Sequence, residues 1–276
     1  MPTILFSTAN NAFSPETEAY TTRLAHLLIN RNKPILSADR LLKWPQLRIL
    51  DLCTGTGCIA LLLHAILSAK LSDTQLHGVD ISRQALALAN QNLRWNIAQT
   101  HLRQVAREQV RFVQGDIFHD LPILSGTWDI VISNPPYISP YSFTTDTSRS
   151  VRIFEPKSAL VPPYAYTLSD GEGGTLEQEL AIGDAFYPRL LEIAAKVDAK
   201  FLLMEVANMK QAKRVVDLAV KDGHWDGYEI WRDYPDQSVA SGGDALEIKG
   251  QSVKILGEGH GRSVFLSRAG GVNMFG

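Results

Sequence analysis

The sequence predicts a doubly wound α/β fold, in which seven strands form one mainly parallel sheet with one antiparallel strand near an edge. Three observations predict it. Short apolar runs rich in β-branched residues alternate with longer helical patterns. A glycine-rich turn joins the first of these strands to the helix that follows it. The last two predicted strands, 228–231 and 263–266, have no helix between them, which predicts an antiparallel pair.

The composition narrows the class of protein. The chain has 276 residues, of which 45% are hydrophobic and 20% charged, so it can bury a full core. A formal net charge of -2 argues against broad, non-specific binding of nucleic acid, which needs a basic surface. The two cysteines, Cys53 and Cys58, share one glycine loop, which favours a reducing compartment over a disulfide framework. No apolar run approaches the roughly 20 residues of a membrane span.

The first predicted helix begins at the run Ser14-Pro15-Glu16-Thr17-Glu18. A serine N-cap, a proline in the first turn and acids near the positive helix end are typical of a helix start. Residues 1–13 are expected to be irregular, and 36–42 to form a second short helix. We therefore divide the chain into a short N-terminal helical segment, 1–46, and one α/β domain, 47–276.

The glycine-rich turn over 53–57 is the first candidate for a binding site. It lies between a buried strand at 48–52 and an apolar helix at 58–70, in a Gly-x-Gly-x-x-Ala pattern. Glycines let a ligand approach the backbone closely, and the start of a helix supplies free N–H groups. The pattern is typical of sites for nucleoside-containing cofactors, although short glycine patterns also recur without function.

Two acids follow the next two strands. Asp80 closes the strand at 76–79, where a carboxylate is placed to accept both hydroxyls of a ribose. Asp116 follows the strand at 110–113 and could accept from the exocyclic amine of an adenine. The alternative for Asp116 is an ordinary turn aspartate, since turns favour this residue.

The fourth strand, 129–134, ends in a rigid Asn-Pro-Pro-Tyr elbow, Asn134 to Tyr137. Pro135 and Pro136 remove two backbone donors and fix two φ angles, so the strand cannot continue. The elbow suits a planar amine or amide: the Asn134 oxygen can accept one N–H, the Pro135 carbonyl the other, and Tyr137 can stack on the flat group. A strand followed by a plain Pro-Pro turn is the alternative.

The remainder of the chain continues the alternation. The stretch 138–174 is a long segment with proline, serine and glycine, and loops of that length are commonly functional. A helix is predicted over 176–197, a buried strand over 201–206 and a helix over 211–220. The polar, glycine-dotted stretch 236–261 is expected to be a mobile surface insertion.

Other kinds of site find little support in the sequence. The seven histidines show no paired ligand spacing, so no metal site is predicted. Cys58 has no visible histidine partner, so we interpret it as a packing residue. There is no serine nucleophile elbow and no P-loop lysine.

Taken together, these stretches resemble the class I methyltransferases that use S-adenosylmethionine. More closely, the chain resembles the HemK/PrmC family, the glutamine methyltransferases of peptide-chain release factors. The resemblance extends from about Ser14 and rests on these runs: Pro15-Glu16-Thr17-Glu18, Leu50-Asp51-Leu52-Cys53-Thr54-Gly55-Thr56-Gly57-Cys58-Ile59-Ala60, Gly78-Val79-Asp80-Ile81-Ser82, Gly115-Asp116-Ile117-Phe118, Ser133-Asn134-Pro135-Pro136-Tyr137-Ile138, Val151-Arg152, Glu155-Pro156, Ala159-Leu160, Glu205 and Arg232-Asp233-Tyr234. The elbow alone is shared with DNA adenine and other amine methyltransferases, and its combination with the other runs is more specific.

The resemblance implies a Rossmann-like class I methyltransferase fold and a reaction. A methyl group would pass from S-adenosylmethionine to the side-chain amide nitrogen of the glutamine in a Gly-Gly-Gln motif. The implied catalytic residues are Asn134, Pro135, Pro136 and Tyr137, with Asn134, Pro135, Tyr137 and Phe13 binding the substrate. The implied cofactor-binding residues are Asp51, Cys53, Thr54, Gly55, Thr56, Gly57, Cys58, Asp80, Ile81, Asp116, Ile117 and Asn134. No general base is required first, because the sulfonium is already a strong electrophile.

The resemblance also implies partners and a compartment. The partner would be a release factor as protein substrate, with no stable nucleic-acid binding and no membrane. The run Arg149-Ser150-Val151-Arg152 resembles the mitochondrial branch of fungi and animals, which implies a mitochondrial location, with a cytoplasmic one as the alternative.

The chain departs from the family at its start. Only 47 residues precede the first core strand at Arg48, so 1–46 is interpreted as the remnant of a substrate-docking domain. The family's usual Pro-Arg before Pro-Glu-Thr-Glu is Phe13-Ser14 here. Three other functions stay open: a methyltransferase acting on an adenine or guanine amine, an NAD-dependent dehydrogenase that uses the same glycine pattern and Asp80, and a cofactor-binding protein without catalysis.

Overall fold

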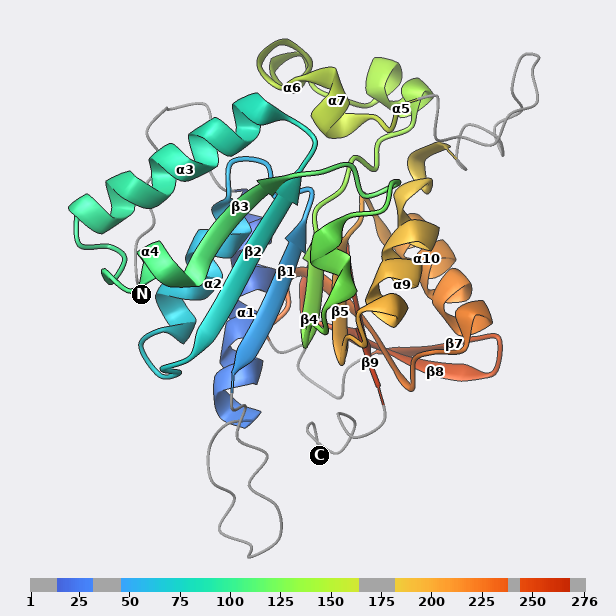
Figure 1. Cartoon of the computed structure of the whole chain (residues 1–276). Helices are drawn as coiled ribbons and strands as arrows, with labels where there is room; N and C mark the ends of the chain where they lie inside the picture. The colour runs from blue at the N-terminus through green and yellow to red at the C-terminus, as the bar shows by residue number, and fades with distance from the viewer. Residues whose placement is uncertain (1–13, 32–45, 164–181, 238–243, 269–276) are drawn as a thin grey trace, which may run out of the picture.

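A computed structural model describes residues 14–31, 46–163, 182–237 and 244–268 (Figure 1). Phe13 and the helix expected at 36–42 lie outside these ranges. None of the helices in the described ranges is long and apolar enough to cross a membrane.

Within the described residues, nine strands form a single sheet in the order β3-β2-β1-β4-β5-β9-β6-β8-β7. The strands are β1 Leu47–Leu52, β2 Thr74–Asp80, β3 Val110–Gln114, β4 Ile130–Ser133, β5 Phe201–Glu205, β6 Gly227–Tyr234, β7 Ala245–Ile248, β8 Gln251–Leu256 and β9 Glu258–Ser267. Strands β1 to β5 pair in parallel, and β9 lies antiparallel between β5 and β6. The prediction of a mainly parallel, doubly wound sheet is confirmed.

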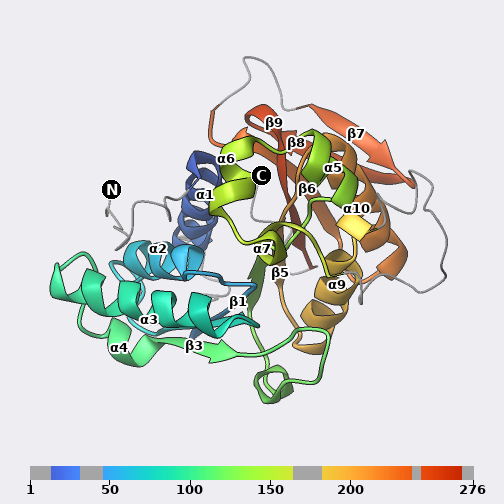
Figure 2. The ribbon, with the colours of Figure 1, turned by 90° about the horizontal axis from the view of Figure 1, so that it is seen from above.

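Helices cover both faces of the sheet, as Figures 1 and 2 show. They are α1 Pro15–Arg31, α2 Cys58–Leu67, α3 Arg83–Ala98, α4 Ala106–Gln109, α5 Pro140–Thr145, α6 Arg149–Phe154, α7 Lys157–Leu160, α9 Phe186–Lys196 and α10 Met209–Asp222, with a 3-10 turn at Pro122–Ser125. Side chains of α1, α2 and α3 pack with one set of strand residues, and those of α9 and α10 with the other. Ile49 and Leu50 face opposite cores, because successive strand residues point to opposite faces.

The first helix begins as the sequence predicts. The Ser14 hydroxyl accepts from the backbone N–H of Thr17 at 3.1 Å, which is an N-cap bond. Tyr20, Leu24 and Leu28 are buried in the core that α2 also lines. The helix is therefore packed onto the α/β domain by a continuous apolar stripe.

The prediction for 236–261 is wrong for the part that the structure describes. Instead of a mobile insertion, it contains β7, β8 and the first residues of β9, which extend the sheet from seven strands to nine. Besides β9, β7 is also antiparallel to its neighbour, β8, while β8 pairs in parallel with β6. The turn between β7 and β8 has positive φ at Lys249 (50°) and Gly250 (79°), as two-residue hairpin turns require.

Two other boundaries differ from the prediction. The helix expected over 176–197 is described only as α9, and residues 164–181 lie outside the described ranges. The long segment after the elbow contains three short helices, α5, α6 and α7, which lie beyond the carboxyl ends of the parallel strands (Figures 1 and 2).

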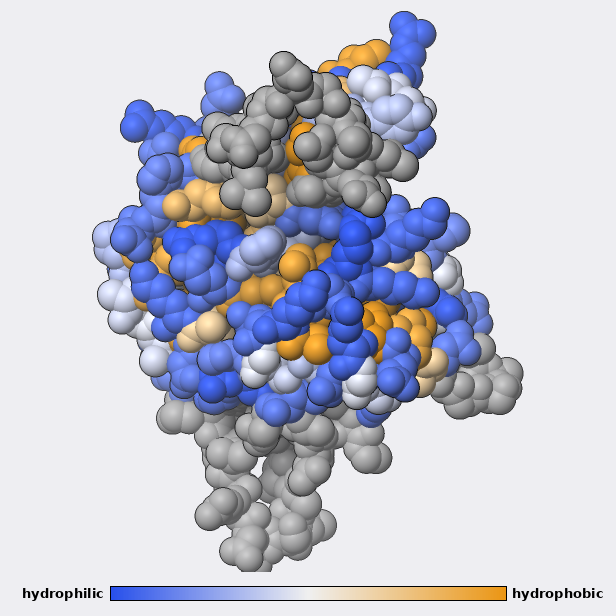
Figure 3. All heavy atoms as spheres, turned by 90° about the vertical axis from the view of Figure 1, so that its right-hand side faces the viewer, coloured by the Kyte–Doolittle hydropathy of each residue, from blue (hydrophilic) through white to orange (hydrophobic). Residues whose placement is uncertain are grey.

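On the side of α9, α10 and the β7–β8 hairpin, hydrophilic side chains surround smaller apolar patches (Figure 3).

Candidate active site

Strand register brings the predicted site residues to one edge of the sheet. Leu52 at the end of β1 pairs with Val79 of β2 and with Ser133 of β4. The glycine loop, Asp80 and the elbow therefore begin side by side. The backbone N–H of Gly115 donates to the carbonyl of Asp80 at 3.0 Å, which brings the turn after β3 to the same edge. This edge, where carboxyl ends of parallel strands meet, is where such sheets bind ligands.

The glycine loop has an unusual backbone. Cys53, Gly55 and Gly57 have positive φ angles of 60°, 56° and 80°. A Cβ on Gly57 would lie 2.6 Å from the ring of Phe112, so this glycine permits close packing of α2 on the sheet. A Cβ on Gly55 would meet no atom within 4 Å. The backbone of Gly55 therefore borders open space.

Asp80 lies beside that space and is fixed by two backbone groups. Its Oδ2 accepts from the N–H of Gly55 at 2.8 Å, and its Oδ1 accepts from the N–H of Ser82 at 2.8 Å. A carboxylate oxygen has two lone pairs, so each oxygen can accept one further hydrogen bond. The next residue, Ile81, is an apolar side chain with 57% of its surface exposed. Together these groups offer paired acceptors next to an apolar surface.

Asp51 and the two cysteines have buried polar groups that pack within and beneath the glycine loop. The Asp51 carboxyl group is fully buried and accepts from the Thr54 hydroxyl at 2.6 Å. Burial raises the pKa of Asp51 to about 7. Burial also raises the pKa of Cys58 to about 11 and that of Cys53 well above its usual value. Neutral thiols are poor nucleophiles, which agrees with the interpretation of Cys58 as a packing residue.

The turn after β3 is also fixed internally. The Oδ1 of Asp116 accepts from the N–H of Phe118 at 3.0 Å, and its Oδ2 lies 3.1 Å from the Nδ1 of His119. The carbonyl of the buried Ile117 accepts from the Nε of Arg189 on α9 at 2.7 Å. The geometry allows both functional and plain turn roles for Asp116.

The elbow follows a fully buried strand. The Ser133 hydroxyl donates to the Leu52 carbonyl at 2.7 Å, which fixes the end of β4 to the start of the glycine loop. Pro135 and Pro136 are buried. Asn134 is half-buried, and its side chain forms no hydrogen bond within the part of the chain that the structure describes. Its amide oxygen is therefore an acceptor available to a ligand beside the glycine loop.

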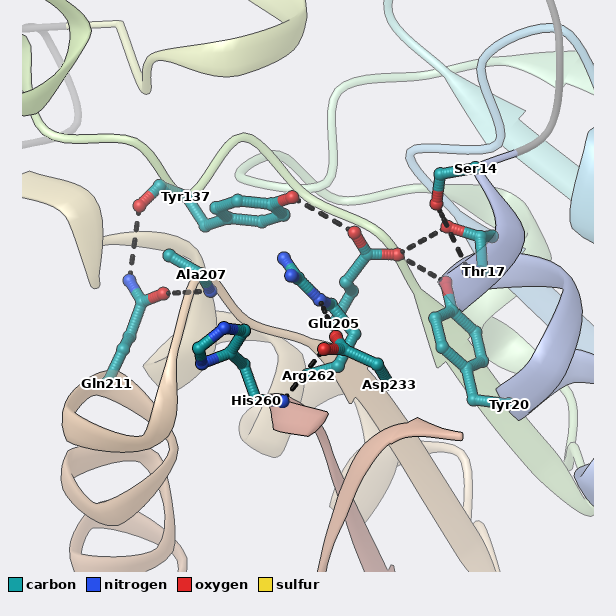
Figure 4. Close-up of polar contacts among 10 residues, drawn as sticks. All are labelled: Ser14, Thr17, Tyr20, Tyr137, Glu205, Ala207, Gln211, Asp233, His260 and Arg262. Atoms are coloured by element: carbon teal, nitrogen blue, oxygen red, sulfur yellow. Dashed lines mark hydrogen bonds and ion pairs between the residues drawn. The ribbon is translucent and has the colours of Figure 1, made fainter. Parts of the chain in front are cut away.

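Tyr137 is fixed at both ends. Its hydroxyl donates to Oε1 of Glu205 at 3.0 Å, and its carbonyl accepts from Nε2 of Gln211 at 3.2 Å (Figure 4). The ring lies between these two contacts and cannot swing freely. Stacking of the ring on a planar ligand stays a prediction.

Sequence reasoning missed most of the surroundings of Tyr137. Glu205 appeared only as part of a family resemblance, and Gln211 and Arg262 were not singled out as site residues. One signal was visible: Glu205 is an acid in an otherwise apolar, buried strand, where a charged side chain needs partners. The partners come from distant segments, so the sequence alone could not name them.

Two predictions, on metal binding and on Phe13, remain to be placed. No group of three or more histidine, cysteine, aspartate or glutamate side chains there could hold a metal ion. Phe13, a predicted substrate contact, lies outside the described ranges, next to the N-cap Ser14.

The sequence of the chain is similar to those of known methyltransferases. Residues 44–173 match the family model Methyltransf_31, described as a methyltransferase domain. The chain is 32% identical over 192 residues to the probable MRF1 mitochondrial N(5)-glutamine methyltransferase mtq1 of Schizosaccharomyces pombe, a match that covers 68% of this chain and 56% of that protein. It is 30% identical over 221 residues to the release factor glutamine methyltransferase of Bacillus subtilis, covering 79% of this chain and 62% of that protein.

Among solved structures, the catalytic domain of hMettl16 in complex with a MAT2A 3'UTR hairpin is similar in fold. The TM-score is 0.50 at 13% sequence identity, over 91% of this chain and 69% of that one. The fold is that of the class I methyltransferases, and residues 44–173 match a methyltransferase-domain model.

In sequence, the chain is similar to release factor glutamine methyltransferases, among them the probable mitochondrial enzyme of Schizosaccharomyces pombe. The resemblance seen in the sequence is thereby confirmed. The alignments to these two relatives span 56% and 62% of their length, so the chain covers less than two thirds of each.

Proposed function

We propose that this chain transfers a methyl group from S-adenosylmethionine to the side-chain amide nitrogen of the glutamine in the Gly-Gly-Gln motif of a peptide-chain release factor. The observation that carries the proposal is the half-buried Asn134, whose side chain has no hydrogen-bond partner among the described residues, beside the glycine loop. The names of the relatives from Schizosaccharomyces pombe and Bacillus subtilis support glutamine as the acceptor.

The glycine-loop edge fits the proposed methyl donor. The open space over Gly55 leaves room for a ligand at the backbone, and the two oxygens of Asp80 match a ribose diol. Residues 53–58 would hold the methionine part, while Ile81, Asp116 and Ile117 would border the adenine. Asp51 would keep the loop in shape through Thr54. When bound, S-adenosylmethionine supplies a methyl group on a positively charged sulfur, which is a strong electrophile.

The elbow would hold the acceptor. The Asn134 side-chain oxygen accepts one N–H of the glutamine amide and the Pro135 carbonyl accepts the other, which aims the nitrogen at the methyl group. Pro135 and Pro136 have no N–H, so neither residue can occupy these oxygen acceptors in place of the amide. Tyr137 provides an aromatic wall, held by Glu205 and Gln211.

Positioning is the main contribution that these residues make. The amide lone pair is delocalised, so the nitrogen is a weak nucleophile, and good orientation of two reactants is worth roughly 7–11 kcal/mol. The cofactor would supply the methyl group and keep the electron pair of its sulfur–carbon bond, the oxygens of Asn134 and Pro135 would hold the nitrogen that receives the methyl group, and the amide proton would then leave to water. No side chain has to remove a proton before transfer.

The N-terminal segment 1–46 is part of the same proposal. We assign it to docking of the protein substrate, with Phe13 as a substrate contact. The mitochondrial name of the Schizosaccharomyces pombe relative favours a mitochondrial release factor as the substrate.

Label transfer tests the function. Purified chain and labelled S-adenosylmethionine would be offered a mitochondrial release factor, the same factor with its Gly-Gly-Gln glutamine changed to alanine, and bulk RNA and DNA. Label on the intact factor alone is the expected result. Label on nucleic acid would replace the proposal with a base-amine methyltransferase, and cofactor binding without label on any of them would contradict catalysis on this substrate.

A further inference from the structure

A buried polar cluster joins the first helix to the elbow. Its centre is Glu205 at the carboxyl end of β5, with only 4% of its surface exposed. The Oε2 atom accepts from the Thr17 hydroxyl at 2.9 Å and from the Tyr20 hydroxyl at 2.6 Å, both on α1. The Oε1 atom accepts from the Tyr137 hydroxyl at 3.0 Å (Figure 4). One carboxyl group thus connects two segments that are far apart in the sequence.

Packing alone does not call for an acid at this position. The four strand residues before Glu205 are apolar and buried, and an apolar side chain here would continue the core. Burial of a carboxylate costs several kcal/mol unless hydrogen bonds compensate. Three hydroxyl donors provide that compensation, and two of them come from α1.

A cation lies on the other side of the same cluster. The Nε of Arg262 on β9 donates to Oδ1 of Asp233 on β6 at 3.0 Å, and Oδ2 of Asp233 accepts from the backbone N–H of His260 at 2.7 Å. Burial raises the pKa of both Tyr137 and Glu205, and the positive charge of Arg262 opposes that rise. The cluster is therefore anchored in the antiparallel part of the sheet.

Gln211 on α10 fixes the main chain of the elbow independently. Its Nε2 donates to the Tyr137 carbonyl at 3.2 Å and to Oδ1 of Asp184 at 2.8 Å, and its Oε1 accepts from the N–H of Ala207 at 2.7 Å. Gln211 therefore holds the backbone of Tyr137 from α10, and Glu205 holds the hydroxyl at the other end of the side chain.

We propose that Glu205 is a positioning residue that makes the first two turns of α1 and the aromatic wall of the acceptor site move as one unit. One oxygen holds α1 and the other holds Tyr137, so loosening either contact loosens both segments. The effect on methyl transfer rests on the proposed function. The mechanical coupling between the two segments does not, and it can be measured without an acceptor.

The test uses hydroxyl deletions that keep the rings in place. Tyr20→Phe removes the α1 contact, and Tyr137→Phe removes the elbow contact. Tyr228→Phe is the matched control, because its buried hydroxyl donates to the Trp225 carbonyl at 2.6 Å, away from the cluster. Glu205→Gln removes the charge while keeping the side-chain shape, and the two tyrosine variants test the inference even if Glu205→Gln does not fold.

Hydrogen exchange gives the readout that needs no substrate. In Tyr20→Phe we expect faster exchange both in residues 15–24 and in residues 137–144, and the same pair of changes in Tyr137→Phe. Tyr228→Phe should change neither segment. If Tyr20→Phe accelerates exchange in α1 alone, the coupling does not exist.

Kinetics give the second readout. Because hydrogen bonds to a charged group are worth about 1.5–3 kcal/mol, Tyr137→Phe and Glu205→Gln should each reduce kcat/KM for the acceptor by at least about tenfold. Cofactor affinity should stay within about twofold of wild type. The variant that combines Tyr137→Phe with Glu205→Gln should lose no more kcat/KM than the more impaired of the two single variants. Losses that multiply in the double variant, or that fall equally on cofactor affinity, would overturn the positioning role.

The two proposals fail in different ways. If the wild-type chain labels no release factor, the proposed function fails, while the exchange experiment still decides whether Glu205 couples α1 to the elbow. If the wild-type chain labels the factor but the exchange of 137–144 is unchanged in Tyr20→Phe, the function stands and the coupling is wrong.

Discussion

At the scale of single residues, burial of Asp51 makes the stability of the fold depend on pH. Its folded-state pKa is about 7, against an ordinary value of 3.8, because the buried site disfavours the charged form. A group with a raised folded-state pKa stabilises the fold below its unfolded pKa and loses that contribution as pH rises through the folded value. The contribution of Asp51 is therefore lost between about pH 4 and pH 7.

We expect Asp51→Asn to remove this dependence. At about 1.4 kcal/mol per pKa unit, the free energy of unfolding of the wild type should fall relative to the variant by up to about 4 kcal/mol between pH 4 and pH 7. Denaturant unfolding of both proteins at several pH values measures the difference. Parallel pH curves for the two proteins would contradict the raised pKa.

Gly55 separates backbone strain from ligand binding. Its φ of 56° disfavours a side chain by about 1–2 kcal/mol, and its Cβ direction points into the open space assigned to the cofactor. Gly55→Ala should therefore weaken S-adenosylmethionine binding at least about tenfold while lowering stability modestly. Calorimetric titration and thermal unfolding measure the two effects.

Gly223 provides the control for that experiment. It caps the end of α10 with a φ of 72° and has no atom within 4 Å of an added Cβ. Gly223→Ala should cause a similar loss of stability with unchanged cofactor affinity. Equal cofactor affinity in the two alanine variants would show that the space over Gly55 is not the binding site.

At the scale of elements, the β7–β8 hairpin shows where sequence patterns were insufficient. Val253 and Ile255 are buried and alternate with the exposed Ser252 and Lys254, which is the period of a strand. Six glycines within 236–261 indicate a loop from sequence alone, because glycine is uncommon in strands. The alternation was present, but only pairing with β6 makes so short a strand stable.

The turn of this hairpin allows a stabilising change. Lys249 has a φ of 50°, which is unfavourable for a lysine but common for asparagine, and Asn-Gly is the preferred pair in such turns. Lys249→Asn should raise the free energy of unfolding by about 0.5 kcal/mol. Denaturant unfolding of the variant tests this, and a loss of stability would contradict the assigned turn geometry.

The prediction was most accurate where local patterns and the site coincide. The strand, glycine loop and helix around Gly55 and the N-cap at Ser14 follow from short stretches with strong backbone preferences. The surroundings of Tyr137 do not, because Glu205 and Gln211 reach it from β5 and α10. Contacts between distant segments depend on the whole fold and leave only weak local signals.

At the scale of the whole molecule, topology explains why separate motifs form one site. The order β3-β2-β1-β4 places Asp116, Asp80, the glycine loop and Asn134 along one edge, although 83 positions separate Asp51 from Asn134. The parallel strands and the doubly wound connections could be predicted from the alternation of elements. The pairing of Asp233 on β6 with Arg262 on the neighbouring strand β9 could not.

The measurement that tests the central claim most directly is the comparison of wild type with Asn134→Ala in two assays, S-adenosylmethionine binding by calorimetry and single-turnover methyl transfer to the release factor. Because the Asn134 side chain bonds to no other described residue, its removal should leave the fold and cofactor affinity nearly unchanged while abolishing transfer. Full transfer by the variant, or equal loss of binding and transfer, would contradict the elbow as the acceptor site.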